Sequence, residues 1–300
     1  MDYIVKPLAF DYNTNLKIFE DLTAEFSFLR PAVIGRTALG RGIFSLSLGN
    51  EKNSVILAGG FHGSEWLTSL VLYLFTERLC RCISKKSTMC GVDPEKAFSQ
   101  LGVTVIPCVN PDGTEIAVHG INGAKRLREF VASLGCSNYR KWNANALGVD
   151  INHNFNAGWE KLREIEHEAG IDKPSCSRYG GAYAESEAET KALTRLCRLK
   201  RFRSCMAIHS QGKEIFWQYG ESTPESAEMM AKILADSCGY KLVNNEGLYS
   251  HGGFKDWFIE EFSSPGFTME IGKGENPLPK EELYEIYAEI EEALLLFCLM

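Results

Sequence analysis

The stretch GGFHGSEW, residues 59–66, places two glycines, a histidine and a glutamate directly after the apolar run SVILA. A second and longer apolar run, LTSLVLYLF, follows it. A short apolar run that ends in glycines predicts a buried strand, and the longer amphipathic run predicts a helix. The chain therefore concentrates polar side chains in a tight loop at the end of a strand.

Strand-like and helix-like stretches alternate along the whole chain. Apolar runs predict strands at 43–49, 54–60, 103–109, 204–210, 214–219 and 266–271. Apolar residues that recur every three or four positions predict helices that begin near Glu65, Ser186, Ser226, Phe254 and Lys280. The strand runs are continuous rather than alternating, which suits a sheet covered on both faces. We expect one α/β domain over residues 1–300.

The composition is that of an ordinary soluble protein. Of the 300 residues, 45% are hydrophobic and 24% are charged, and the formal net charge is -7. This acidic balance gives no support for nucleic acid as a partner. The longest apolar runs are too short to span a bilayer, and the N-terminus carries no apolar core of signal-peptide length. We therefore expect a cytoplasmic protein with no membrane partner.

The ten cysteines are scattered, and none forms a C-x-x-C pair. Cys108, Cys205 and Cys298 lie in apolar runs, which predicts small buried side chains rather than disulfides. No cysteine stands at an obvious strand-to-helix turn with a histidine partner, so a cysteine hydrolase is a weak alternative.

His62 and Glu65 lie three residues apart, in the loop and in the first turn of the following helix. Gly59, Gly60 and Gly63 let this backbone turn tightly, so that the imidazole and the carboxylate can reach one cation. Zinc accepts such nitrogen and oxygen ligands, and a catalytic zinc site uses three protein ligands plus water. On its own, the pair is also compatible with a helix-stabilising glutamate beside a loop histidine.

The third ligand should be a distant histidine at a strand end. His209 fits, because it ends the apolar run SCMAI and precedes the turn SQG. Ligands of α/β proteins gather at such strand ends. His119, His167 and His251 lie in polar or glycine-rich surroundings, where we expect a surface or loop role.

Glu270 is the one charged residue in the apolar stretch FTMEIG, residues 267–272. Burying a carboxylate without a partner is costly, so this position predicts a metal neighbour or a general base for bound water. A strand residue that faces solvent is the alternative.

The stretch LGVDINHNFNAGW, residues 147–159, lies in a long region rich in Gly, Asn and Ser, 135–184, and long loops are often functional. Asp150 can accept a hydrogen bond from a ligating imidazole, and Asn152 and His153 can bind substrate. A turn rich in Asn and Asp is the structural alternative.

Taken in order, these motifs resemble those of the zinc carboxypeptidases over about residues 34–295. The matching stretches are HGSE (62–65), NPDG (110–113), GVDINHNF (148–155), HSQG (209–212), GGFKDW (252–257) and FTMEIG (267–272). The resemblance implies a single α/β domain with a mixed twisted sheet and helices on both faces. Residues 1–33 would form an N-terminal extension packed on that domain.

The resemblance also implies roles for individual residues. His62, Glu65 and His209 match the ligands of one zinc ion, and Glu270 matches the general base that deprotonates the zinc-bound water. Asp150 matches the partner of the first histidine.

Three positions bear on substrate binding. Asn152 matches a contact to the substrate backbone, whereas His153 stands where familiar members have the arginine that holds the terminal carboxylate. Histidine is not a bidentate fork, so we do not expect digestive-type removal of any C-terminal residue. Tyr249 matches the family's tyrosine, although it lies one residue closer to the following glycines.

Familiar members support the oxyanion with a second arginine, for which Arg140, Lys141 and Asn143 are the local candidates. Lys255 matches the position that lines the pocket for the side chain after the scissile bond. A lysine there predicts an acidic group on the substrate, and a helix-surface lysine is the alternative.

His153 and the segment GGFKDWF resemble the bacterial branch that cleaves γ-D-glutamyl–meso-diaminopimelate bonds in cell-wall peptides. Diaminopimelate carries a carboxylate and an amine on its side chain, which suits Lys255. The expected partner is therefore a small peptide such as L-Ala-γ-D-Glu-meso-diaminopimelate. The alternatives are a zinc amidohydrolase acting on N-acyl amino acids and a non-catalytic peptide-binding relic, which need not keep Glu270.

Overall fold

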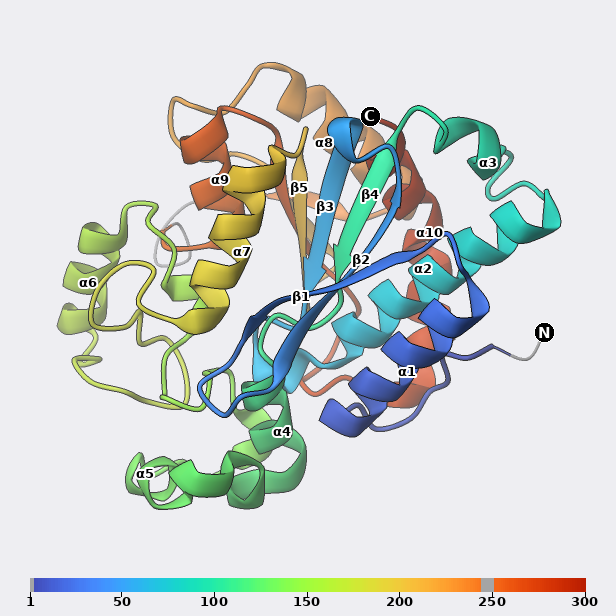
Figure 1. Ribbon diagram of the computed structural model, residues 1–300. Coiled ribbons are helices and arrows are strands. Elements are labelled where there is room, and N and C mark those ends of the chain that lie inside the picture. Colours follow the sequence, from blue (N-terminus) through green and yellow to red (C-terminus); the bar gives the residue numbers. More distant parts are fainter. Residues whose placement is uncertain (1–2, 244–250) are drawn as a thin grey trace.

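The computed structural model describes residues 3–243 and 251–300 (Figure 1). One mixed sheet of eight strands forms its centre, in the order β1-β2-β4-β3-β5-β8-β6-β7. The strands are β1 (Arg30–Arg36), β2 (Gly42–Gly49), β3 (Ser54–Gly59), β4 (Gly102–Ile106), β5 (Cys205–His209), β6 (Glu214–Phe216), β7 (Lys241–Val243) and β8 (Gly266–Glu270). The expected mixed sheet is confirmed.

Four neighbouring strands in the middle of the sheet, β4, β3, β5 and β8, run parallel to one another. Strands β1 and β2 add antiparallel pairs on one side, and β6 pairs antiparallel with β8 on the other. The carboxyl ends of the four parallel strands therefore share one edge of the sheet, where open α/β sheets bind their ligands. At this edge His209 and Glu270 are register partners on β5 and β8.

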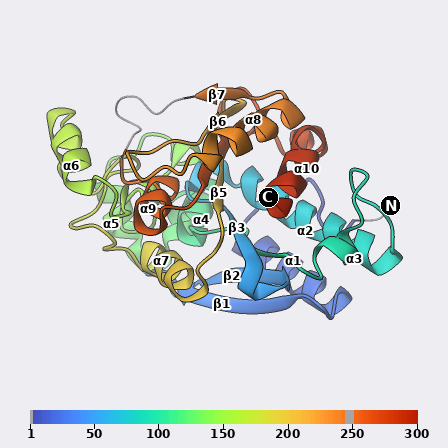
Figure 2. The same ribbon diagram turned by 90° about the horizontal axis from the view of Figure 1, so that it is seen from above.

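Helices cover both faces of the sheet, as expected (Figures 1 and 2). One face carries α1 (Tyr12–Glu25), α2 (Leu67–Lys85), α8 (Ser226–Cys238) and α10 (Leu283–Leu299), and the other carries α7 (Ala188–Lys200) and α9 (Phe254–Phe262). The connections hold α3 (Pro94–Ala97), α4 (Pro111–His119), α5 (Arg128–Ser133) and α6 (Trp159–Glu168).

Strand β3 shows why its sequence is continuously apolar. Val55 and Leu57 belong to the hydrophobic cluster that includes α2 and α10, whereas Ile56 and Ala58 belong to the cluster that includes α7 and α9. Successive side chains of a strand point to opposite faces, so a strand covered on both faces needs apolar residues at every position.

Some elements differ from the sequence-based expectation. The helix predicted near Glu65 begins at Leu67, after a 3-10 turn over Gly63–Glu65. Strand β1 was not predicted, because it is an exposed edge strand whose apolar run in RPAVIGR is only three residues long and lies between a proline and a glycine. Residues 1–33 include α1 and the start of β1, and α1 packs into the core through Ile18 and Leu22. The boundaries proposed for that extension stay a prediction.

Two remaining expectations concern cysteines and membranes. All ten cysteines are free thiols, and Cys108, Cys205 and Cys298 are buried, which confirms their interpretation as small core residues. Within the described ranges 3–243 and 251–300, no helix combines the length and the apolar character needed to cross a membrane.

Candidate active site

A cavity of about 530 Å³ opens at the carboxyl edge of the parallel strands. Its wall includes His62, Glu65, His209 and Glu270, which the sequence had singled out from four separate positions. His62 and Glu65 follow β3, His209 ends β5, and Glu270 ends β8. The topology of the sheet therefore brings these side chains into one site.

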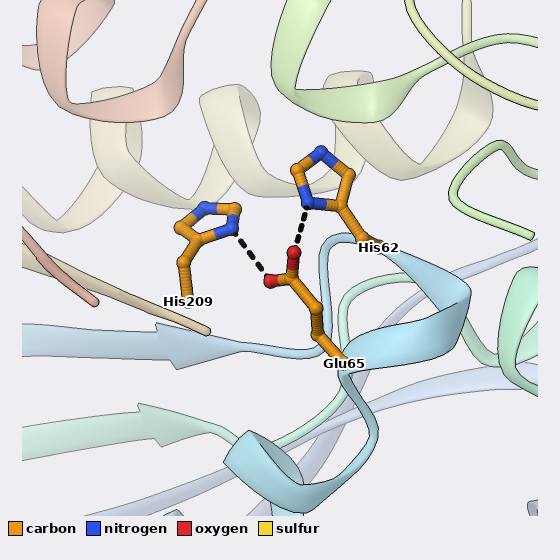
Figure 3. A group of neighbouring side chains, drawn as sticks. All are labelled: His62, Glu65 and His209. Atoms are coloured by element: carbon orange, nitrogen blue, oxygen red, sulfur yellow. Dashed lines mark hydrogen bonds and ion pairs between the residues drawn. The ribbon is translucent and has the colours of Figure 1, made fainter. Parts of the chain in front are cut away.

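His62, Glu65 and His209 converge through the carboxylate of Glu65 (Figure 3). Glu65 Oε1 lies 2.8 Å from His62 Nδ1, and Glu65 Oε2 lies 2.9 Å from His209 Nδ1. One ligand atom from each residue lies within 4.8 Å of the other two. Both imidazoles thus turn the same ring nitrogen toward one point beside the carboxylate.

The backbone around the three residues allows little variation. A Cβ at Gly63 would lie 2.3 Å from the carbonyl oxygen of Gly113, so only glycine fits at this position of the loop. The ring of Phe61 stacks on His209, with ring centroids 5.0 Å apart, and fixes the plane of that imidazole. In the NPDG segment, Asn110 Nδ2 donates to the carbonyl of Phe61 over 2.9 Å and thereby anchors the same loop.

Asp150 holds the outer nitrogen of His62. Its Oδ1 lies 3.0 Å from His62 Nε2, and its Oδ2 accepts a hydrogen bond from the backbone N–H of Arg178 over 2.9 Å. Asp150 is almost fully buried. A carboxylate in this position orients the imidazole and leaves Nδ1 to face the shared point, as expected for the partner of a metal-ligating histidine.

The electrostatics of the cluster attract positive charge. Burial opposes ionisation of Glu65, but the imidazoles of His62 and His209 outweigh it and lower the pKa of that carboxyl to about 2. Burial likewise opposes a charge on His62, yet Glu65 and Asp150 raise its pKa well above the ordinary value. Either a proton or a metal cation can supply the positive charge that the two carboxylates favour.

The donor set fits zinc. Two imidazole nitrogens and one carboxylate are the ligands of a catalytic zinc site that keeps a position open for water. Glu65 and His209 are buried, and no lysine or arginine competes for the Glu65 oxygens among the described contacts, which come from His62, His209, Ser210 and Asn276. The site therefore combines the ligand types, the spacing and the negative charge that this ion requires.

Glu270 lies beside the cluster but outside it. It is partly buried, and burial together with the negative charge of Glu65 raises its pKa well above the ordinary value. A carboxyl with a raised pKa beside candidate metal ligands suits a general base, because the pKa that favours proton transfer lies above the ordinary value of a carboxyl.

The sequence model of the zinc carboxypeptidase family matches residues 16–293 of this chain, which is most of its length. The chain belongs to the zinc carboxypeptidase family. The enzyme class expected from the sequence is thereby confirmed, as a peptidase of the metallocarboxypeptidase type.

Individual relatives support the assignment to this family. Gamma-D-glutamyl-L-diamino acid endopeptidase 1 of Lysinibacillus sphaericus is 30% identical over 282 residues, covering 93% of this chain and 70% of that protein. Carboxypeptidase B of Rattus norvegicus is 29% identical over 259 residues, covering 80% of this chain and 57% of that protein. The crystal structure of thrombin activatable fibrinolysis inhibitor matches with a TM-score of 0.75 at 20% identity, covering 97% of this chain and 74% of that one, which shows the shared fold.

The residues that the sequence analysis predicted to bind substrate divide into two groups. Asn143, Asn152, His153 and Lys255 all line the cavity. Arg140 does not: it is exposed on the 3-10 turn Tyr139–Lys141, outside the lining residues.

Of the other residues expected near the substrate, Lys141 is not brought to the cavity wall. Lys141 is exposed and pairs with Glu275, with Nζ 3.1 Å from Oε2. Tyr249 lies outside the described residues. Of the three candidates for supporting the oxyanion, the structure therefore brings only Asn143 to the cavity.

The asparagines of the wall are held from behind. Asn143, which lines the cavity, accepts a hydrogen bond from Ser64 Oγ at its Oδ1 over 2.6 Å, which leaves its Nδ2 amide as a donor. Asn152 Oδ1 accepts from the backbone N–H of Phe254 over 3.1 Å and joins the wall to the start of α9. Both side chains thus keep amide N–H groups for a substrate.

His153 and Lys255 are both paired. His153 Nδ1 lies 2.8 Å from Glu166 Oε1, and although burial opposes it, the charges of Asp150 and Glu166 raise the pKa of this imidazole. Lys255 is buried and forms an ion pair with Asp256, and its Nζ donates to the carbonyl of Gln218 over 2.9 Å. Lys255 is therefore not a helix-surface lysine.

Sequence reasoning missed several residues of the wall, among them Arg178, His251 and Asp256. Asp256 follows Lys255 in GGFKDW, and a carboxylate next to a buried lysine was a signal that could have found it. Arg178 lies in the long loop 135–184, in which the sequence analysis named only earlier residues such as Asp150 and His153. His251, expected in a loop role, lines the cavity and lies with Nδ1 3.0 Å from the hydroxyl of Tyr219.

Proposed function

We propose that this zinc peptidase hydrolyses the bond between γ-D-glutamate and meso-diaminopimelate in cell-wall peptides. The observation that carries the proposal is the buried ion pair of Lys255 and Asp256 on the wall of the cavity that contains His62, Glu65 and His209. The side chain of diaminopimelate ends in a carbon that bears both a carboxylate and an ammonium group. A wall with one cation and one anion complements that zwitterion.

Other side chains match this wall less well. A purely acidic side chain would pair with Lys255 but face the carboxylate of Asp256, and a purely basic one would face the ammonium of Lys255. Removing one partner of a buried ion pair is costly, because the other charge is left without compensation. The pair therefore requires a side chain that carries both a negative and a positive charge. Lys255 alone would require only an acidic group. The name of the Lysinibacillus sphaericus relative, an endopeptidase acting at a diamino acid, is consistent with it.

The residues around the cavity divide the chemistry. We assign His62, Glu65 and His209 as the ligands of one zinc ion, which when bound polarises the scissile carbonyl and acidifies a water molecule. Glu270 takes a proton from the attacking water and delivers it to the leaving amine. Asn143 directs its Nδ2 amide at the carbonyl oxygen that gains charge.

The test is a hydrolysis assay read by mass spectrometry. Zinc-loaded protein is incubated with L-Ala-γ-D-Glu-meso-diaminopimelate and with its lysine counterpart, which lacks only the side-chain carboxylate. We expect release of free diaminopimelate at a rate at least about tenfold higher than release of lysine, because a charge-assisted contact contributes roughly 1.5–3 kcal/mol. Lys255→Met should remove most of this preference.

Two outcomes would reject the proposed substrate. Equal cleavage of the lysine counterpart would show that the ion pair does not select a zwitterion. Cleavage restricted to N-acyl-aspartate or N-acyl-glutamate would favour an amidohydrolase with the same ligand set. The cytoplasmic location expected from the sequence stays a prediction.

A further inference from the structure

Two side chains among the described residues lining the cavity carry a fixed positive charge, Arg178 and Lys255. They differ in their surroundings. Lys255 is buried and already holds Asp256 and the carbonyl of Gln218. Arg178 is exposed, and its guanidinium has no hydrogen bond or ion pair to any described residue. The wall therefore offers one arginine fork for an anion that no described residue supplies.

The backbone of Arg178 is tied to the site on both sides. Its N–H donates to Asp150 Oδ2 over 2.9 Å, and its carbonyl oxygen lies 3.0 Å from His153 Nδ1. The same Asp150 holds His62 through its other oxygen. Two residues earlier, the carbonyl of Cys176 accepts the backbone N–H of Asn143 over 2.9 Å. These bonds fix the base of the Arg178 side chain against the residues that surround the candidate metal position.

His153 cannot take the anion in the way an arginine does. Its Nδ1 is engaged by Glu166 and by the Arg178 carbonyl, so at most Nε2 is left to donate. A carboxylate is held best by two parallel N–H donors, which a guanidinium provides and an imidazole does not. Arg178 originates from the same corner of the cavity as His153, because the two residues are joined by a hydrogen bond.

We propose that Arg178 is a specificity-determining residue that binds the free terminal carboxylate of the substrate. This inference rests on the proposed peptidase function and adds the mode of attack. The protein removes a terminal residue whose α-carboxylate is free, and it discriminates against the same residue inside a longer chain. The side-chain zwitterion goes to the pair of Lys255 and Asp256, and the α-carboxylate goes to Arg178.

The experiment compares two substrates that differ only at this group. One is L-Ala-γ-D-Glu-meso-diaminopimelate, and the other carries an amide in place of the α-carboxylate next to the scissile bond. We expect the wild type to cleave the free acid at least about tenfold more efficiently, as kcat/KM, because a hydrogen bond to a charged group contributes on the order of tenfold or more. The difference should lie mainly in KM.

Variants of the arginine make the assignment specific. Arg178→Ala should lower kcat/KM for the acid by about tenfold and leave the amide unchanged, so that the two substrates become equivalent. Arg178→Lys should restore part of the preference, because lysine keeps the charge but not the fork. Arg195→Ala, an exposed arginine of α7 outside the cavity lining, is the matched control and should behave as wild type.

A binding measurement separates this inference from the substrate proposal. Isothermal titration needs no turnover and compares meso-diaminopimelate with its monoamide at the carboxylate that lies next to the scissile bond in the peptide. We expect the wild type to bind the acid more tightly than the amide and Arg178→Ala to bind both alike. Equal binding of acid and amide by the wild type, or a preference that survives in Arg178→Ala, overturns the role of Arg178. Cleavage of the lysine counterpart as fast as of the diaminopimelate peptide, with an Arg178-dependent acid preference, rejects the substrate but supports the carboxylate site.

Discussion

Two groups of the described residues bring histidine and carboxylate atoms within metal-binding distance of one another, and they lie in different parts of the molecule. One is His62, Glu65 and His209 at the carboxyl edge of the sheet. The other is a surface cluster of Asp11, Glu115 and His119, located where α1 meets α4. The residue types are similar, so the difference between the groups shows which of them is the better candidate for a metal site.

In the surface cluster the carboxylate oxygens already have structural partners. Asp11 Oδ1 accepts the backbone N–H of Thr14 over 2.8 Å and caps α1. Glu115 Oε2 pairs with Arg41 over 2.9 Å, and Glu115 Oε1 accepts the N–H of Tyr12. His119 is exposed. Backbone amides and an arginine therefore already bond to the carboxylates of this cluster.

In the cavity the carboxylate of Glu65 has no permanent cationic partner. Its oxygens face the imidazoles of His62 and His209, and no arginine or lysine among the described residues bonds to them. The proximity of histidines and acids is thus common to both groups. What distinguishes the cavity is that its carboxylate lacks a permanent cation and faces open space large enough for a substrate.

The largest effect is expected from exchanging one histidine in each group. His209→Ala should abolish stoichiometric zinc binding and all detectable hydrolysis, because a catalytic zinc site needs its three protein ligands. His119→Ala should keep both. Metal analysis after exhaustive dialysis, together with activity, checks this pair. Loss of one zinc equivalent in His119→Ala would mean that the surface cluster is the metal site.

The sequence made the cavity group predictable because its members lie where apolar runs stop. His209 and Glu270 each end a buried strand, and His62 and Glu65 follow one, so a change from apolar to polar residues marks all four. Their convergence follows from the parallel order of β3, β5 and β8, which the strand and helix alternation already favours.

Arg178 and Asp256 could not be found in the same way. Arg178 reaches the cavity only because its backbone is hydrogen bonded to Asp150 and His153, and no periodicity in a loop reports such long-range contacts. Lys255 and Asp256 are consecutive in a helix, where neighbours do not normally face each other, so their ion pair is a consequence of tertiary burial. The exposed strand β1 was not predicted because its apolar run is short and is bounded by a proline and a glycine.

The second largest effect concerns the base. Glu270→Gln should retain zinc but lower kcat by about 10²–10⁴, the range that a positioned general base contributes. The same chemical change in the surface cluster, Glu115→Gln, should leave kcat within about twofold of wild type. Steady-state kinetics at saturating zinc decides the matter. Unchanged turnover in Glu270→Gln would remove this residue from the mechanism.

Glu189 is another buried carboxyl, and its contact among the described residues is the amide of Asn145 rather than an imidazole. Burial, together with the charges of Asp112 and Glu187, raises the pKa of Glu189 to about 8. The pKa of Glu65, in contrast, is lowered to about 2. Its Oε1 has no hydrogen-bond partner within the part of the chain that the structure describes. The folded state therefore binds the Glu189 proton more tightly than the unfolded state does.

The sign of the pH dependence follows from this shift. Glu189 makes the free energy of unfolding fall as pH rises from its ordinary pKa of 4.5 to about 8, by up to about 1.4 kcal/mol per pH unit. Glu189→Gln cannot ionise and should lack this contribution. Denaturant unfolding of both proteins between pH 5 and pH 8 measures it, and parallel stability curves would show that Glu189 is ionised in the fold.

The smallest effect is expected at the helix cap of the surface cluster. Asp11→Ala should lower the free energy of unfolding by about 1 kcal/mol, as is usual for an N-cap, with zinc content and kcat unchanged. Burial opposes ionisation of Asp11, but the bonds from Thr14 and His119 lower its pKa, so its contribution is lost as pH falls through that pKa. Loss of zinc from Asp11→Ala would mean that the surface cluster, and not the cavity group, binds the metal.

A zinc titration of metal-stripped protein decides whether the cavity is the active site of a wall-peptide peptidase. Hydrolysis of L-Ala-γ-D-Glu-meso-diaminopimelate is followed by mass spectrometry as zinc is added, with His209→Ala alongside. We expect diaminopimelate release to rise from zero to a plateau at one zinc per wild-type chain and to stay absent in His209→Ala. Release that is independent of zinc, or that persists in His209→Ala, would refute the assignment of the site.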